Sequence, residues 1–325
     1  MAETLLDLSD LRVTIATRGR SGEVLRGVQL RVTEGRNLGI VGESGSGKSM
    51  TALAILRELP LAARVTAGRI LYRGADLLTL DGSRLRALRG GEIAIVFQNA
   101  IAALNPLLPV GRQIADVYRV HEKAAKSEAW KRAVVLLGEM GMPDPALRAR
   151  AYPHELSGGM AQRAMVAMAL ASSPRVLIAD EPTTGLDLTI EAQVLELISR
   201  EAARAGTTLI LISHDIEVVA DLCAEIAVMY AGEVVEFGPL ADVLERSAHP
   251  YTRELVACSR TTGNGGRLPF IPGQVPNLRE PISGCPFAPR CPRATDFCRR
   301  EAPPAIEVAP GHSAACHYAD EVAKT

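Results

Sequence analysis

The sequence predicts an α/β protein with a largely parallel central sheet, an inserted helical subdomain and a small Cys-rich C-terminal region. Short aliphatic runs alternate with segments whose apolar residues recur every three or four positions, as on one face of a helix. A long stretch without strand patterns interrupts this alternation once, and the composition changes after residue 258.

Four short apolar runs have the composition of strands buried on both faces. They are Leu38–Val41, Ile93–Phe97, Val176–Ala179 and Thr208–Ile212. Helical periodicity fills Ser49–Glu58, Glu128–Leu137, Gly158–Ala171 and Ile190–Arg204. Because no strand pattern lies between Phe97 and Val176, we expect residues 98–173 to form a helical subdomain inserted in a sheet domain of residues 1–258.

The composition of the chain restricts its class. The 325 residues are 47% hydrophobic and carry a formal net charge of −1. The longest apolar run, Ala164–Ala171, is far shorter than the roughly 20 residues that cross a bilayer. Residues Met1–Asp10 have acidic but no basic side chains, so no secretion signal is visible. The near-zero charge and the lack of a basic block disfavour nucleic acid as a partner.

A glycine-rich segment follows the first predicted strand and precedes the first predicted helix. It reads Gly42, Glu43, Ser44, Gly45, Ser46, Gly47, Lys48 and Ser49, which matches the phosphate-binding pattern G-x-x-x-x-G-K-[ST]. Backbone N–H groups of such a loop surround phosphates, the lysine reaches the β and γ phosphates, and the hydroxyl binds Mg²⁺. A flexible glycine turn is the alternative, but only five of the 36 basic residues are lysines, which disfavours a chance Lys48.

Two adjacent carboxylates end the predicted strand Val176–Ala179. Asp180 has the chemistry to hold Mg²⁺, and Glu181 has the chemistry to orient the attacking water or accept its proton. An acidic pair at a strand end is more often a solvated loop. The apolar strand before it and the upstream phosphate loop favour the catalytic interpretation.

The segment between these motifs resembles the signature motif of ABC ATPases. Ser157, Gly158 and Gly159 open an apolar helix, Gln98 is similar to the Q-loop residue, Asp187 to the D-loop residue, and His214 to the switch histidine. The resemblance implies an ABC nucleotide-binding domain over residues 1–258, with the sheet of a P-loop ATPase, that binds ATP and Mg²⁺ and hydrolyses ATP. Without it, His214 would be read as a core histidine and Gln98 as an ordinary strand-end residue.

The same resemblance assigns roles to these residues. Lys48, Glu181 and His214 are the implied catalytic residues, and Ser49, Gln98 and Asp180 are the implied Mg²⁺ contacts. The signature residues would contact ATP bound to a second ATPase subunit, so dimerisation is implied. Asp187 is a further implied contact of the nucleotide.

Further motifs narrow the resemblance to the ATPase subunits of oligopeptide and dipeptide importers. They are Phe97–Asn99, Leu104–Pro106, Met160 and His249–Thr252. Such a subunit is bound at the cytoplasmic face of the inner membrane, where it powers the uptake of peptides or related small solutes into the cell. The implied partners are a related second ATPase subunit, two permease subunits that contact residues 98–114, and an extracytoplasmic solute-binding protein.

Two other classes of function remain open alternatives. One is a soluble ABC protein that acts on ribosomes or DNA, which the single set of motifs and the lack of sustained heptads disfavour. The other is a regulatory subunit with an inactive site, which the intact motifs disfavour. One departure concerns adenine: Ile15 stands where the family commonly has an aromatic residue, and Arg18 or Arg20 would have to substitute.

The last 67 residues, Ser259–Thr325, contain ten of the 20 prolines and four of the six cysteines, with almost no helical or strand periodicity. Cys285, Cys291, Cys298 and Cys316 suit a soft metal site, and their spacing leaves zinc and an iron–sulfur cluster as alternatives. Disulfides are disfavoured in the reducing compartment of an ATP-consuming chain. The resemblance to the importer ATPases favours a 4Fe-4S cluster. Cys223 and Cys258 fall in helical patterns and are expected to be inert.

Overall fold

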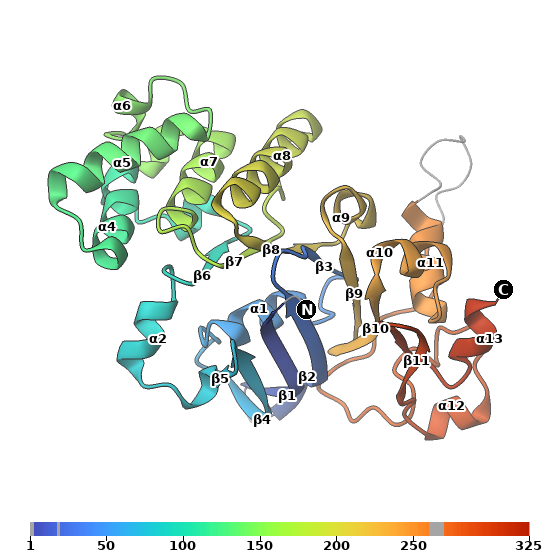
Figure 1. Ribbon diagram of the computed structural model, residues 1–325. Helices are drawn as coiled ribbons and strands as arrows, with labels where there is room; N and C mark the ends of the chain where they lie inside the picture. The colour runs from blue at the N-terminus through green and yellow to red at the C-terminus, as the bar shows by residue number, and fades with distance from the viewer. Residues whose placement is uncertain (1–2, 18–19, 260–269, 325) are drawn as a thin grey trace. The chain divides into compact units, whose positions relative to one another are not determined.

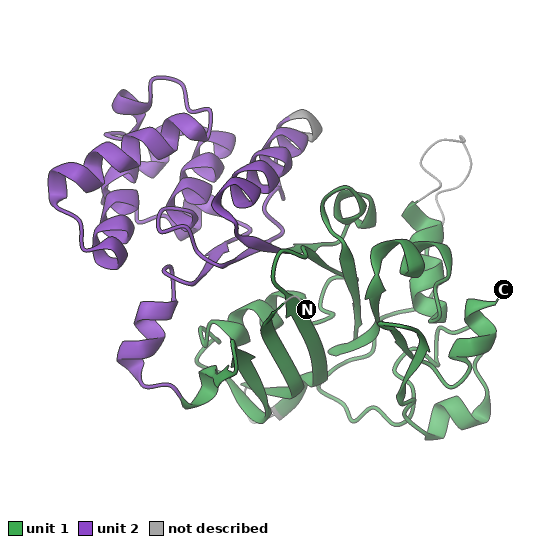
Figure 2. Cartoon of the chain, viewed as in Figure 1, with its two compact units in different colours: residues 1–79, 211–325 green, residues 80–210 purple. Residues whose placement is uncertain are grey.

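The computed structural model describes residues 3–17, 20–259 and 270–324, and the chain divides into two compact units (Figures 1 and 2). Unit 1 comprises Met1–Thr79 and Leu211–Thr325, and unit 2 comprises Leu80–Ile210. Strand β8, Thr208–Ser213, is buried throughout and passes from unit 2 into unit 1. Unit 1 is therefore discontinuous in sequence.

Unit 1 contains an antiparallel sheet with the strand order β2-β1-β4-β5. Its strands are β1 (Thr4–Thr17), β2 (Arg20–Thr33), β4 (Ala63–Tyr72) and β5 (Ala75–Asp76). Alternate apolar side chains such as Leu6, Val13 and Leu25 are fully buried, so one face of the sheet packs on the core. The sequence analysis had assigned no strand to these segments.

A second sheet of unit 1 has the strand order β11-β12-β10-β9-β3. The strands are β3 (Leu38–Val41), β9 (Glu225–Tyr230), β10 (Glu233–Pro239), β11 (Ala305–Ala309) and β12 (His312–Ala315). Strands β3 and β9 are parallel, whereas β9–β10, β10–β12 and β11–β12 are antiparallel. The parallel pairing expected of the apolar runs therefore holds for β3, whereas β10, β11 and β12, for which the sequence predicted no strand, add antiparallel pairs and make the sheet mixed.

The helices of unit 1 are short. They are α1 (Lys48–Ile55), α9 (Ile216–Leu222), α10 (Leu240–Glu245), α11 (Pro250–Ser259), α12 (Asp296–Arg300) and α13 (Ala319–Ala323), with a 3-10 turn η1 (Leu77–Thr79). Helix α1 follows β3 after a loop of residues 42–47, as predicted, and begins one residue earlier than the periodicity indicated.

The C-terminal segment is more regular than its sequence indicated. Strand β12 pairs with β10, which joins this segment to the sheet (Figure 1). At the junction the buried Glu236 carboxylate accepts hydrogen bonds from His312 Nε2 at 2.8 Å and from the backbone N–H groups of Ala248 and His249 at 2.7 and 2.9 Å. The prediction of little regular structure fails because β11 and β12 are only a few residues long and rich in alanine.

Unit 2 is mainly helical (Figure 2). Its helices are α2 (Gly82–Leu88), α3 (Ala100–Ala103), α4 (Val110–Glu122), α5 (Lys126–Glu139), α6 (Pro145–Arg148), α7 (Gly158–Ala169) and α8 (Leu188–Ala205), with a 3-10 turn η2 (Pro153–Glu155). Strands β6 (Ile93–Val96) and β7 (Val176–Asp180) pair in parallel. Between them the described chain contains only helices and loops, as predicted.

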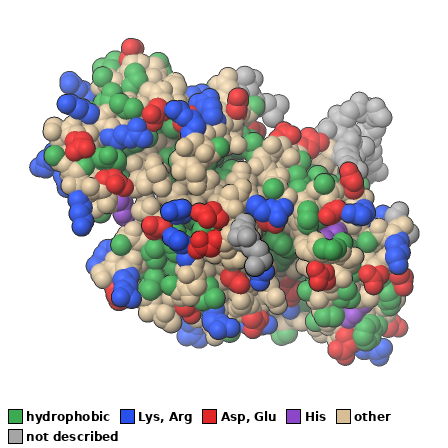
Figure 3. Space-filling model, viewed as in Figure 1, with side chains coloured by type: hydrophobic (Ala, Val, Ile, Leu, Met, Phe, Trp, Pro, Cys, Tyr) green, Lys and Arg blue, Asp and Glu red, His purple; other side chains and the backbone are tan. Residues whose placement is uncertain are grey.

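The surface of the described residues carries both signs of charge. On the face drawn in Figure 3, Lys and Arg side chains are interspersed with Asp and Glu side chains. Within the described part of the chain, none of the helices has the length and apolarity required to span a bilayer.

Candidate functional site

The phosphate loop in unit 1 connects the buried strand β3 to helix α1. Gly42, Gly45 and Gly47 all have positive φ angles, of 151°, 80° and 106°. At Gly42 a Cβ would lie 2.2 Å from the carbonyl oxygen of Met229, so only glycine fits there. This backbone leads directly into the N-terminus of α1, where N–H groups are available to phosphate oxygens.

Lys48 is the first residue of α1 and is only 5% exposed. Its ammonium donates to the carbonyl oxygens of Gly42 at 2.7 Å and Glu43 at 3.2 Å. The positive charge is therefore held against the loop that would receive a phosphate. Ser49 follows within the same helix, whereas the buried Ser46 hydroxyl has no hydrogen-bond partner among the described residues.

Glu43 contacts residues outside the loop with both its backbone and its side chain. Its backbone N–H donates to the hydroxyl of Tyr251 at 2.9 Å, and its carboxylate pairs with Arg290 at 2.6 Å. The predicted nucleotide contact of Glu43 therefore rests on its backbone, because its side chain is engaged by the C-terminal segment.

Asp180 and Glu181 lie at the end of β7 in unit 2. Asp180 is 8% exposed, and Glu181 follows it with a φ of 43°, a conformation that costs a non-glycine residue free energy. The Glu181 carboxylate accepts hydrogen bonds from Gln98 Nε2 and from Thr184 Oγ1, both at 3.1 Å. The structure thus joins two predicted site residues, Gln98 and Glu181.

The predicted signature residues open helix α7. Ser157 is the N-cap residue, and its hydroxyl accepts a hydrogen bond from the N–H of Met160 at 3.3 Å. Asp187 caps α8 in the same way, since its carboxylate accepts from the N–H of Ile190 at 3.0 Å. Gly158 and Gly159 belong to the first turn of α7.

A pocket of about 370 Å³ in unit 2 brings three predicted motifs together. Gln98 lines it from the end of β6, Gly158 from the signature helix, and Gly185 and Leu186 from the loop before α8. Polar and backbone groups from separate motifs therefore converge on one pocket.

His214 follows β8 in unit 1 and is exposed. The neighbouring residues define its loop: the Ser213 hydroxyl accepts from the N–H of Asp215 at 2.9 Å, and Asp215 caps α9. The imidazole is therefore at the surface of the unit that carries the phosphate loop. Ile15 lies in β1 and is partly buried, whereas Arg18 and the side chain of Arg20 lie outside the described residues.

The four cysteines of the C-terminal segment line one cavity in unit 1, together with His249 and Phe287. Burial raises the pKa of the Cys285 thiol to about 11 and also raises the pKa of the Cys291 and Cys316 thiols. Four converging thiols have the donor chemistry of a soft metal or iron–sulfur site.

The space in this cavity is small, about 20 Å³, which is enough for one water molecule. Among the described residues no three His, Cys, Asp or Glu side chains are arranged to hold a single metal ion. Outside this cavity, Cys223 is buried with its pKa raised to about 12, and Cys258 is partly exposed.

Sequence reasoning missed Arg290 and Tyr251 as neighbours of the phosphate loop. Both are far from the loop in sequence. No local pattern indicates that the partner of Arg290 is Glu43.

Family models match two parts of the chain. The model for ABC transporters matches residues 25–184, and the model for the C-terminal region of oligopeptide and dipeptide transporters matches residues 235–298.

Curated relatives match the chain over nearly its whole length. A probable peptide ABC transporter ATP-binding protein from Sinorhizobium fredii is 48% identical and covers 99% of this chain and 97% of its own length. The oligopeptide transport ATP-binding protein OppD of Salmonella typhimurium is 42% identical, with 97% and 94% covered. The dipeptide transport ATP-binding protein DppD of Bacillus subtilis is 42% identical, with 99% and 97% covered.

A solved structure shares the fold of most of the chain. It is a dimeric ATP-binding cassette in a post-hydrolysis state with ADP and Pi bound. The TM-score is 0.64 at 28% identity, and the match covers 72% of this chain and 98% of that chain.

Proposed function

The chain belongs to the family of ABC transporter ATP-binding subunits that serve oligopeptide and dipeptide transport, and we propose that it powers the uptake of peptides or related small solutes. It is an ATPase whose hydrolysis of ATP is coupled to transport. The observation that carries the proposal is the match to peptide-transport subunits along both the cassette and the C-terminal region.

The proposed roles of the site residues follow the geometry within each unit. In unit 1, the loop Gly42–Ser49 surrounds the phosphates, with Lys48 at the β and γ phosphates, Ser49 at Mg²⁺ and His214 at the γ phosphate. In unit 2, Asp180 is a Mg²⁺ contact and Glu181 orients the attacking water. The hydrogen bond from Gln98 to Glu181 supports a shared role at that step.

A second ATPase subunit completes this proposed site. In unit 2, Ser157 caps the N-terminus of α7, whose first turn contains Gly158 and Gly159, and Asp187 caps the N-terminus of α8. Such N-termini favour anions, and we propose that they contact ATP bound to the partner. A related but different ATPase subunit is the proposed partner.

The loop before α4 in unit 2 carries exposed apolar side chains and is a candidate docking surface for permease subunits. Leu107 is 81% exposed, and Ile101 and Leu108 are also exposed apolar residues. Gln113 holds this loop from α4: its side-chain amide donates to the carbonyl oxygens of Asn105 at 3.0 Å and Leu108 at 2.9 Å. We propose that these apolar side chains contact two permease subunits at the cytoplasmic face of the inner membrane.

Reconstitution tests the proposed function. The chain and its co-purifying subunits would be placed in proteoliposomes with ATP on the side that carries this chain. A solute-binding protein and labelled dipeptides or oligopeptides would be supplied on the other side. We expect ATP-dependent peptide accumulation on the side that contains ATP. ATP hydrolysis without movement of any peptide, or movement in the opposite direction, would overturn the proposal.

We also propose that Cys285, Cys291, Cys298 and Cys316 hold a 4Fe-4S cluster that orders the C-terminal segment, with zinc as the alternative. The support is their convergence on one cavity and the mutual charge effects that help to raise the pKa of Cys291 and Cys316. Thiolates in this cavity would repel one another, and a bound cation would offset that repulsion.

Anaerobic purification followed by iron, sulfide and zinc assays separates the cluster from zinc. We expect iron and acid-labile sulfide in equal amounts, lost in Cys291→Ser and retained in Cys258→Ser, which changes a cysteine outside the cavity. Stoichiometric zinc without sulfide would contradict the cluster.

A further inference from the structure

The C-terminal segment reaches the phosphate loop through one ion pair. Both guanidinium nitrogens of Arg290 bind the Glu43 carboxylate: Nη1 donates to Oε2 at 2.6 Å and Nη2 to Oε1 at 3.0 Å. The Arg290 side chain is 3% exposed and the Glu43 side chain 28% exposed, so the arginine end of this two-pronged pair is shielded from water. Glu43 is the second residue of the loop, and 247 positions separate the partners in the sequence.

The remaining donors of Arg290 are also satisfied. Nε donates to the carbonyl oxygen of Pro272 at 2.9 Å, Nη2 to that of Ile271 at 3.0 Å, and Nη1 to the hydroxyl of Tyr230 at 3.3 Å. A guanidinium fixed on all sides holds its partner in one place. The Glu43 carboxylate is therefore oriented by the C-terminal segment.

The turn that carries Arg290 packs against two tyrosines, Tyr230 and Tyr251, that are connected to the phosphate loop. Phe287, in the same turn, is 1% exposed, and its ring lies 5.3 Å from the ring of Tyr230 and 5.5 Å from that of Tyr251. Tyr230 ends strand β9, which pairs with β3, and Tyr251 accepts the hydrogen bond from the N–H of Glu43. Both the backbone and the side chain of Glu43 are thus held from outside the loop.

The negative charge of Glu43 affects how well the phosphate loop can bind a nucleotide. The loop must receive a triphosphate, and an uncompensated carboxylate in the loop would repel it. Arg290 neutralises that carboxylate and holds it in a fixed position, while Lys48 donates to the carbonyl oxygen of the same residue.

We propose that Arg290 is a positioning residue of the phosphate loop, through which the C-terminal segment sets the affinity of this ATPase for MgATP. The proposal rests on the proposed function only in that MgATP is the nucleotide. Cys285 and Cys291 lie at the two ends of the turn that carries Arg290. Changes in the cysteine cavity therefore reach the phosphate loop through the ion pair between Arg290 and Glu43.

The test compares variants of the full chain by MgATP calorimetry and, with the companion subunits present, by hydrolysis kinetics. Arg290→Met should weaken MgATP binding by about tenfold or more, because it leaves a carboxylate unpaired. KM should rise while kcat changes little. Arg300→Met, which alters an exposed arginine of α12, is the matched control and should bind like the wild type.

The double variant Glu43→Gln/Arg290→Met gives the decisive result. Removing the carboxylate as well should restore affinity to within about threefold of the wild type. If Arg290 only held the segment in place, the double variant would bind as weakly as Arg290→Met, and the proposal would fail. Unchanged affinity in folded Arg290→Met would also overturn it.

Thermal unfolding establishes that each variant is folded. If Arg290→Met does not fold, Arg290→Gln decides the matter, because glutamine removes the charge but retains an amide that can donate hydrogen bonds. A folded glutamine variant with reduced affinity supports the proposal, and one with wild-type affinity overturns it. A wild-type chain that binds no MgATP would instead contradict the proposed function, so the two failures are distinguishable.

Discussion

Glu181 combines a strained backbone with a well-defined side chain. Its φ of 43° is maintained while its carboxylate accepts hydrogen bonds from Gln98 and Thr184. Strain of this kind persists where the surrounding structure enforces it, and it is frequent at active sites. At the scale of a residue, this is the feature of the structure that most directly supports the catalytic interpretation.

The first prediction concerns Glu181→Gln. Glutamine preserves the size of the side chain but cannot accept a proton, so kcat for ATP should fall by about 100-fold or more. MgATP affinity should remain within about threefold, because the proposed phosphate contacts are made by other residues. Glu196→Gln, an exposed position on α8, is the control. Turnover at the wild-type rate in Glu181→Gln would show that another group carries the catalysis.

A second prediction follows from His249, which is buried. Burial lowers the pKa of His249 from 6.5 to about 3. Between these values the unfolded chain binds a proton and the folded chain does not, so unfolding becomes easier as the pH falls. Above pH 6.5, His249 does not lower the free energy of unfolding. Below pH 6.5, the free energy of unfolding declines by roughly 1.4 kcal/mol per pH unit.

Denaturant unfolding between pH 7 and pH 5 measures this slope. His249→Asn should flatten it, because an Asn oxygen can still accept the hydrogen bond that His249 Nδ1 receives from the N–H of Tyr251. His154→Asn, which changes an exposed histidine, should leave the slope as it is. An equally steep slope in His249→Asn would contradict the assignment.

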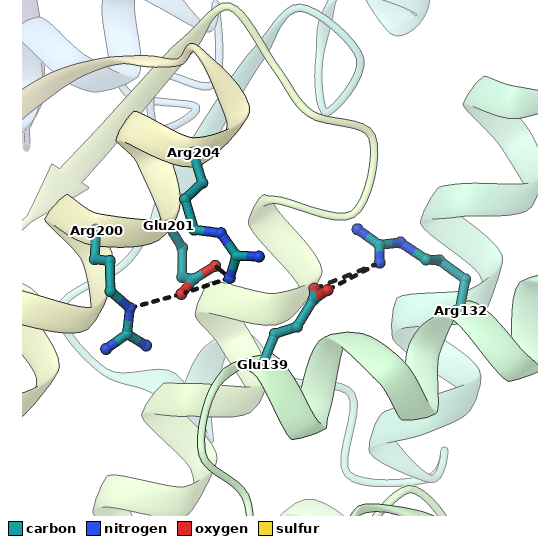
Figure 4. Close-up of polar contacts among 5 residues, drawn as sticks. All are labelled: Arg132, Glu139, Arg200, Glu201 and Arg204. Atoms are coloured by element: carbon teal, nitrogen blue, oxygen red, sulfur yellow. Dashed lines mark hydrogen bonds and ion pairs between the residues drawn. The ribbon is translucent and has the colours of Figure 1, made fainter.

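At the scale of an element, α8 is stabilised at its C-terminal end by a buried carboxylate. Glu201 is 7% exposed, and it pairs with Arg200 at 2.8 Å and Arg204 at 3.1 Å, as Figure 4 shows. A second pair in unit 2 joins Arg132 and Glu139 of α5. Both arginines that pair with Glu201 are more than half exposed, so water screens much of the attraction.

The third prediction is that Glu201→Ala lowers the free energy of unfolding by about 1 kcal/mol. The loss is modest because the arginines remain hydrated. Glu196→Ala on the same helix should change it by less than about 0.5 kcal/mol. Guanidinium titration of both variants gives the comparison, and equal effects at the two positions would refute the role of Glu201.

The loop before α4 belongs to the proposed docking surface for permease subunits. A fourth prediction is that Leu107→Asp abolishes peptide uptake in the reconstituted complex, because a charge on an apolar contact surface disfavours docking. MgATP affinity of the isolated chain should stay within about twofold, since Leu107 is absent from the phosphate loop. Val135→Asp, at another exposed apolar position, is the control and should retain uptake.

At the scale of the molecule, those parts of the candidate site that consist of contiguous residues could be predicted from the sequence. The loop Gly42–Ser49, the strand before it and the signature helix are each contiguous, so their chemistry is visible in the sequence. The antiparallel sheet β2-β1-β4-β5 was missed, although its strands contain alternating apolar residues. The site roles and the division at residue 258 remain proposals.

Contacts between distant segments were not predictable. The sequence gives no indication that Arg290 meets Glu43, or that His312 meets Glu236, because each pair depends on how the C-terminal segment returns to the sheet. The cysteines illustrate an intermediate case. Their convergence on one cavity was expected from composition, whereas the small volume of that cavity was not.

The pairing of β12 with β10 also bears on the order in which the protein is made. The residues of unit 2 are all synthesised before Leu211, whereas strand β3 of unit 1 must wait for its partner β9 from the second half of the chain. Until His312 emerges from the ribosome, the buried Glu236 has no imidazole to bind it. We therefore expect the helical unit to fold first during translation, and unit 1 to close only after almost the whole chain is complete.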